Sequence, residues 1–173
     1  MKNSPTGKKV FSLISWILFG VGALLIILFA ATPGGLSSKE SGFFSGIVKS
    51  ILNFFSPGFI NESNEDLFHS VLRKLVGHFG LFGFTGVFGY FAFATTVIHP
   101  KHPFLFHVLE TLGTGLFLAF GSEGIQRIPG LARSGEFKDV LIDLSGFVLG
   151  LLLAALIWYL VERHQKKKAS MTE

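Results

Sequence analysis

Four apolar segments, each nearly free of charged residues, constrain the fold of this chain more than any other feature. They cover residues 11–31, 76–98, 104–123 and 140–161. Each is about 20 residues long, and a helix of that length, rising about 1.5 Å per residue, crosses a hydrocarbon layer of about 30 Å. Only 15% of all residues are charged and 49% are hydrophobic, which is unusual for a soluble domain. The sequence therefore predicts an all-α polytopic membrane protein with four transmembrane helices.

Basic residues gather at the two ends of the chain, in residues 1–10 and 162–173. An even number of spans places both ends on one side of the membrane, and flanking Lys and Arg are typical of the cytoplasmic side. We therefore expect cytoplasmic termini and an outer segment at residues 32–72. The net charge of +4 then reflects membrane anchoring and no nucleic-acid partner. The alternative of a cleaved signal sequence at residues 11–31 is disfavoured, because signal sequences have apolar cores of about 7 to 15 residues.

An amphipathic pattern occupies residues 43–56 of the outer segment. Phe, Ile, Val and Leu recur there every three or four residues, with Ser, Lys and Asn between them. We expect a short interfacial helix with its apolar face toward acyl chains. The alternative is a helix that packs on the other helices as a cap. Pro33 and the glycines after it predict that the first span ends before a turn at residues 32–39.

Glycine recurs at every third position of the second span. The run consists of Gly77, Gly80, Gly83, Gly86 and Gly89. Positions without a side chain let helix backbones approach closely in lipid. We predict that this stripe packs against the fourth span, where Gly146 and Gly150 form a GxxxG pair.

Polar residues within the spans or at their ends form the candidate site, because an unpaired charge there costs about 2.5 to 3.5 kcal/mol to insert. The cluster expected at the outer face consists of Lys74, His78, Glu123, Gln126, Arg133, Asp139 and Asp143. Three roles are open for it: binding of a phosphate or carboxylate headgroup, acid–base chemistry, and a salt-bridge lock on the loop. Nearer the cytoplasm, His107 and Glu110 share one helix face, where they either fix helix orientation or serve a proton or ion pathway.

Several kinds of chemistry have no signal in the sequence. The chain has no cysteine, which excludes disulfides, thiol nucleophiles and Cys-based metal sites. The motifs GxSxG and HExxH, a P-loop and a dinucleotide-binding fingerprint are also missing. We therefore expect no cofactor and no metal site, and the oligomeric state stays open.

The residues of the outer cluster resemble those of the VanZ-like family, which includes the teicoplanin-resistance accessory protein. The resemblance is carried by Arg73-Lys74 ahead of His78-Phe79, by Glu123-x2-Gln126, by Arg133, and by Asp139-x3-Asp143-x2-Gly146-x3-Gly150. It covers residues 70–161 and implies that residues 73–161 form a VanZ-like domain with three spans. Asp143 stands where the family usually has Asn. Since an ionised carboxylate only accepts hydrogen bonds, we expect Asp143 to pair with Arg133 or to stay protonated.

The resemblance implies a multi-pass protein of the bacterial cell membrane that lowers sensitivity to glycopeptide and lipoglycopeptide antibiotics such as teicoplanin. The implied partners are membrane lipid and a lipid-linked cell-wall precursor or a lipoglycopeptide. One alternative is a membrane enzyme acting on lipid or cell-wall intermediates. Another is a proton-coupled transporter, which requires a polar path from His107 and Glu110 to the outer cluster.

Overall fold

The computed structural model describes residues 5–96, 103–131 and 135–171. In this part of the chain the secondary structure is helical, with no strand. Four of the helices are long and apolar enough to cross a membrane: Thr6–Ala31, Glu65–Thr96, Phe104–Gln126 and Phe137–Ser170. The predicted all-α membrane architecture with four spans is confirmed.

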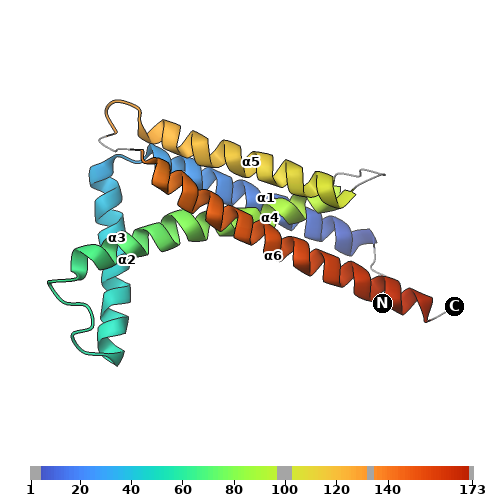
Figure 1. Ribbon diagram of the computed structural model, residues 1–173, viewed down its shortest axis with the longest axis horizontal. Coiled ribbons are helices and arrows are strands. Elements are labelled where there is room, and N and C mark those ends of the chain that lie inside the picture. Colours follow the sequence, from blue (N-terminus) through green and yellow to red (C-terminus); the bar gives the residue numbers. More distant parts are fainter. Residues whose placement is uncertain (1–4, 97–102, 132–134, 172–173) are drawn as a thin grey trace.

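The four spans form a bundle along the long axis of the molecule (Figure 1). The helices are α1 (Pro5–Ala31), α4 (Leu81–Thr96), α5 (Pro103–Gln126) and α6 (Phe137–Ser170). α4 contacts each of the other three, and its Tyr90 is fully buried. The outer surfaces of α1, α5 and α6 carry many exposed Leu, Ile, Val and Phe side chains. An apolar outer surface of this kind suits lipid rather than water.

Glycines bring the backbones of α4 and α6 into direct contact. A Cβ atom built on Gly83 would lie 3.2 Å from the carbonyl oxygen of Gly146, and one on Gly86 would collide with the carbonyl oxygen of Phe147. From the opposite side, a Cβ on Gly150 would collide with the backbone of Gly83. The predicted packing of the glycine stripe against the fourth span is confirmed for these positions.

The other glycines of the run do not take part in this contact. A Cβ on Gly89 would meet the side chains of Phe19 and Thr111, so this glycine faces α1 and α5. One on Gly80 would meet a carbonyl oxygen of its own helix, and nothing lies within 4 Å of one on Gly77. A three-residue step drifts by about 60° around a helix of 3.6 residues per turn. The glycine stripe therefore faces α6 at Gly83 and Gly86 and has turned away from it at Gly89.

The second span begins earlier than the sequence predicted. Helical backbone starts at Glu65 and continues through α3 (Glu65–Leu72), the π-helical segment η1 (Arg73–Gly80) and α4. Backbone hydrogen bonds of a π-helix span five residues instead of four, and such segments are frequent at functional sites. At the end of η1, the N–H of Leu81 donates to the carbonyl oxygen of Val76. The basic pair at residues 73–74 thus lies inside a continuous helix and not at its start.

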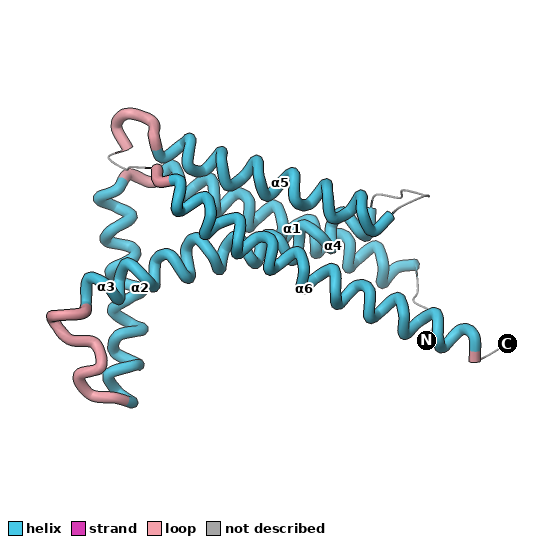
Figure 2. Tube along the Cα trace, viewed as in Figure 1, coloured by secondary structure: helices cyan, strands magenta, loops and turns pink. Residues whose placement is uncertain are grey.

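α2 (Gly34–Phe55) lies across one end of the bundle, beside α3 (Figure 2). It begins immediately after Pro33, which has an extended backbone with ψ of 143°. The predicted end of the first span is confirmed, since α1 ends at Ala31. The predicted turn at residues 32–39 is wrong beyond Pro33, because proline interrupts one helix and is followed by another.

α2 turns its apolar face outward and its polar face toward α3. Phe54 is 81% exposed, whereas Ser45 is 2% exposed and shares a hydrogen bond with the ring of His69. The ammonium of Lys49 lies 2.6 Å from a carboxylate oxygen of Glu65. α2 thus contacts α3 through its polar face, and the choice between an interfacial helix and a cap on the other helices stays a prediction. An exposed apolar face is typical of helices at a membrane interface.

The glycine contact between α4 and α6 generates a stability prediction. Gly150→Ala should lower the free energy of unfolding by about 1–3 kcal/mol, because the new methyl group forces the two backbones apart. Gly113→Ala on α5 is the matched control, since nothing lies within 4 Å of its added Cβ and alanine favours helix by about 1 kcal/mol. Thermal unfolding in detergent measures both. Equal losses of stability would contradict the contact.

Candidate functional site

A buried His–Asp pair lies where η1 meets α6. Nδ1 of His78 is 3.0 Å from Oδ1 of Asp143, and Asp143 is only 1% exposed. A Cβ on Gly146 would collide with the backbone of Phe79, the residue after His78. The close approach of the two backbones therefore brings His78 and Asp143 together.

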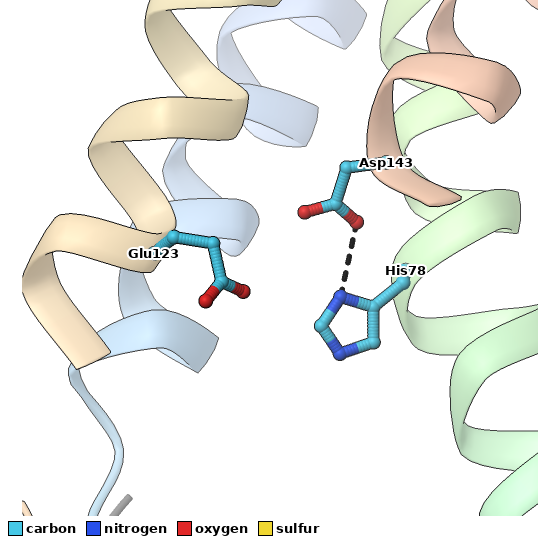
Figure 3. A group of neighbouring side chains, drawn as sticks. All are labelled: His78, Glu123 and Asp143. Atoms are coloured by element: carbon cyan, nitrogen blue, oxygen red, sulfur yellow. Dashed lines mark hydrogen bonds and ion pairs between the residues drawn. The ribbon is translucent and has the colours of Figure 1, made fainter. Parts of the chain in front are cut away.

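Glu123 approaches this pair from α5 (Figure 3). It is 3% exposed, and neither of its carboxylate oxygens has a side-chain hydrogen-bond partner in the described part of the chain. One nitrogen or oxygen atom from each of His78, Glu123 and Asp143 lies within 4.8 Å of the other two. We call these three residues the His–Glu–Asp cluster. Three helical segments thus direct an imidazole and two carboxylates to one point that is shielded from water.

A salt bridge borders the cluster on the same two helical segments. Nζ of Lys74 lies 3.1 Å from Oδ1 of Asp139. Each of these residues comes four positions before its counterpart in the His78–Asp143 pair, so one turn of helix separates the two pairs. The Lys74 side chain is 32% exposed and therefore reaches solvent. Among the described residues, Lys74 neutralises Asp139, and no Lys or Arg forms an ion pair with the carboxylates of the cluster.

The loop between α5 and α6 packs on Glu123 through Gly135. A Cβ on Gly135 would lie 2.8 Å from the backbone carbonyl oxygen of Glu123, so only a residue without a side chain fits there. The loop turns at Gly130, whose φ of +102° favours glycine. Gln126, three residues after Glu123, is buried as well. Arg133, the guanidinium predicted among the carboxylates, lies outside the described residues, so its pairing stays a prediction.

A cavity of about 230 Å³ opens beside the cluster, near the junction of α2 and α3 with the bundle. Most of its wall is apolar, with Ile26 and Phe29 from α1 and Val76 from η1. The polar part of the lining includes Ser45, Arg73, His78, Ser122, Gln126 and Asp143. The predicted site lacks Ser45, Arg73 and Ser122. Arg73 and Ser122 could have been predicted from the sequence, because they directly precede the predicted site residues Lys74 and Glu123.

His107 and Glu110 do not join the cluster. His107 is buried, but it lies 16 residues before Glu123 on α5, which is about 24 Å along the axis. Between Thr111 and Ser122, the buried positions of α5 are Gly115, Leu118 and Ala119. The ring of Phe147 packs where a Cβ on Gly115 would lie. An apolar layer therefore separates the two polar groups along the buried face of α5.

The His78–Asp143 hydrogen bond generates a second stability prediction. Asp143→Leu should lower the free energy of unfolding by about 1–3 kcal/mol, because it leaves a mostly buried imidazole without its acceptor. Asp143→Asn should cost less than half of that, since the amide oxygen still accepts from Nδ1–H. Chemical or thermal unfolding in detergent measures both variants. Equal stability of the Leu and Asn variants would show that the hydrogen bond does not contribute.

Comparisons with known proteins identify no family for this chain. No protein-family model, no curated protein and no solved structure matches it. The VanZ-like resemblance is therefore a prediction carried by the motif residues alone. What the structure establishes is a helical bundle with four candidate membrane spans, a buried His–Glu–Asp cluster at one end and a mainly apolar cavity beside it.

Proposed function

We propose that this chain is an integral membrane protein of the VanZ-like family that binds the anionic headgroup of a membrane amphiphile in the cavity beside the His–Glu–Asp cluster. The observation that carries the proposal is the division of the cavity wall into apolar and polar parts. Ile26, Phe29 and Val76 form part of the apolar wall, whereas Arg73 and Gln126 belong to the polar lining. An amphiphile has the same division, and pockets bind such ligands by apolar walls with a few oriented polar groups.

The guanidinium of Arg73 can hold an anionic group in the polar part of this cavity, where Asp143 is the one carboxylate among the described residues of the lining. Arg73 lines the cavity and is exposed, whereas Lys74 pairs with Asp139. A guanidinium can form two parallel hydrogen bonds with a phosphate or carboxylate. The ligand that suits both the charge and the apolar wall is therefore a phosphorylated lipid or a lipid-linked intermediate.

The surroundings of the cavity favour a ligand that arrives from the lipid phase. α2 contributes Ser45 to the cavity and exposes Phe43 and Phe54 on its opposite, apolar face. With that face in the membrane interface, α2 places the cavity near the level of lipid headgroups. A headgroup can then enter without leaving the interface.

The resemblance to the VanZ-like family suggests the biological setting of this binding. It implies a protein of the bacterial cell membrane that lowers sensitivity to lipoglycopeptides such as teicoplanin. Capture of a lipid-linked cell-wall precursor in the cavity would reduce the amount of precursor accessible to such an antibiotic. We therefore propose a precursor of this type as the amphiphile.

A membrane enzyme acting on the same amphiphile is the second candidate. It is favoured by the His78–Asp143 hydrogen bond, since a histidine oriented by a carboxylate can transfer protons. The third alternative, a proton-coupled transporter, requires a polar path from His107 to the cluster. The apolar layer formed by Gly115, Leu118 and Phe147 argues against such a path.

Filling the cavity should abolish amphiphile binding. Gly77 lines the cavity and nothing lies within 4 Å of its added Cβ, so Gly77→Leu should occupy the space without straining the helix. We expect this variant to bind a polyprenyl phosphate at least tenfold more weakly than the wild type. Gly113→Leu, at an equally open position outside the cavity, is the matched control and should bind normally. Titration of the detergent-solubilised protein, followed by native mass spectrometry, measures the affinities.

Further arms of the same titration identify the ligand chemistry. Arg73→Gln should weaken binding of the polyprenyl phosphate at least tenfold and leave binding of an uncharged polyprenol unchanged. Teicoplanin is tested as the competing ligand. Tight binding of teicoplanin without binding of the phosphate lipid would show that the ligand is the antibiotic and not the precursor. In bacteria that express the protein, Gly77→Leu should lose any protection against teicoplanin that the wild type confers. Unchanged phosphate-lipid binding by Gly77→Leu would overturn the proposed site.

The orientation in the membrane is testable by cysteine labelling, since the chain has no cysteine of its own. The start of α1 and the end of α6 lie at the end of the bundle remote from α2 (Figure 1), and the basic ends of the sequence predict that this side is cytoplasmic. An impermeant thiol reagent should therefore label Glu62→Cys in intact cells, but not Ser170→Cys. Labelling of Ser170→Cys alone would reverse the orientation and place the cavity on the cytoplasmic side.

A further inference from the structure

The His–Glu–Asp cluster carries more negative charge than its described surroundings neutralise. Glu123 and Asp143 are 3% and 1% exposed, so water can solvate neither carboxylate well. Lys74, the nearby ammonium, is bound to Asp139. Buried charges of like sign are costly unless a cation or a proton compensates them. No Lys or Arg among the described residues supplies a positive charge to the cluster, and a protonated His78 would balance only one of its two carboxylates.

Unused acceptor atoms point into this cluster. Both carboxylate oxygens of Glu123 and Oδ2 of Asp143 are buried without a side-chain hydrogen-bond partner in the described part of the chain. Figure 3 shows the Glu123 carboxylate directed from α5 toward His78 and Asp143. In folded proteins, the large majority of buried polar atoms have a partner. Oxygen atoms that are buried, convergent and without a side-chain partner are thus available to a ligand.

The distances suit a small cation. Two atoms that bind one ion at about 2.1 Å each are separated by about 3.0–3.4 Å in octahedral or tetrahedral geometry. Nδ1 of His78 and Oδ1 of Asp143 are 3.0 Å apart. The ligand atom of Glu123 lies within 4.8 Å of theirs, so a modest rotation of its flexible side chain completes the set.

We propose that His78, Glu123 and Asp143 bind one divalent transition-metal cation. The ion takes the place of the proton between Nδ1 of His78 and the Asp143 carboxylate, and that proton is released to water. The two carboxylates balance the charge of the ion. A ligand set of one imidazole nitrogen and two carboxylate oxygens suits Zn²⁺ or Mn²⁺, whereas Mg²⁺ prefers oxygen ligands and retains its water.

The ion would have an open coordination position directed toward the cavity. His78 and Asp143 both line the cavity, and sites with three protein ligands keep a further position for water or substrate. A phosphate headgroup held by Arg73 could occupy that position. This extends the proposed function, but metal binding by the three side chains does not depend on it.

Metal content of the purified chain tests the site directly. The full chain, prepared in detergent with a non-histidine affinity tag and stripped with EDTA, is dialysed against micromolar Zn²⁺, Mn²⁺ or Mg²⁺ and analysed by inductively coupled plasma mass spectrometry. We expect one Zn²⁺ or Mn²⁺ per chain and no retained Mg²⁺. His78→Ala, Glu123→Gln and Asp143→Asn should each lower the affinity at least tenfold. Absence of a bound ion in the wild type overturns the proposal.

Glu65→Gln is the matched control for these variants. Glu65 also faces a histidine, since its Oε1 lies 3.4 Å from Nε2 of His69, but its other partner is Lys49 rather than a second carboxylate. This variant should retain the ion with unchanged affinity. Loss of the ion in Glu65→Gln to the same degree as in Glu123→Gln would place the metal elsewhere and overturn the assignment.

Three further measurements distinguish a failed metal site from a failed fold and from a failed function. Zn²⁺ should raise the thermal midpoint of the wild type and leave that of Glu123→Gln unchanged; equal shifts count against the site. X-ray absorption at the zinc edge should show one imidazole among oxygen ligands, and a spectrum without imidazole also counts against it. Polyprenyl-phosphate binding is measured with EDTA present and with Zn²⁺ present, so that loss of metal binding and loss of amphiphile binding are read independently.

Discussion

The backbone contact between α4 and α6 is the constraint on which the rest of the structure depends. Gly83 meets Gly146 and Gly150, and Gly86 meets the backbone of Phe147, without intervening side chains, so the two helices are as close as their main chains allow. The same contact includes Phe79, the residue after His78, and Gly146, which lies three residues after Asp143. A small change in the distance between the helices would therefore separate the imidazole from its carboxylate. Packing in the apolar half of the molecule determines geometry in the polar half.

The π-helical segment η1 changes the direction of side chains along the second span near its contact with α6. The second span must present glycines to α6 in its α-helical part and His78 to Asp143 one turn earlier. A π-helical segment places side chains at angles different from those of a regular α-helix, and η1 covers Arg73–Gly80. Gly77 and Gly80, which do not contact α6, lie within this segment.

The sequence predicted most of the fold because transmembrane spans depend on local composition. The apolar segments, the glycine contact and the members of the polar cluster follow from length, spacing and the cost of charge in lipid. The start of the second span at Glu65 was missed because α3 is amphipathic and held by Lys49 of α2, a contact between elements. The expectation of no metal site followed from the lack of local motifs. His78, Glu123 and Asp143 come from three separate segments, so their convergence is a property of the bundle.

The apolar layer at Gly115 and Phe147 separates the polar residues at the two ends of α5. A cation bound in the proposed site would exchange through the cavity beside the His–Glu–Asp cluster, whereas His107 lies beyond the layer. The occupancy of the site would therefore follow the ion concentration on one side of the membrane only. Because Glu123 lies near the end of α5 and Asp143 near the start of α6, such an ion would cross only a small fraction of the membrane potential. Its binding would then depend on concentration and very little on voltage.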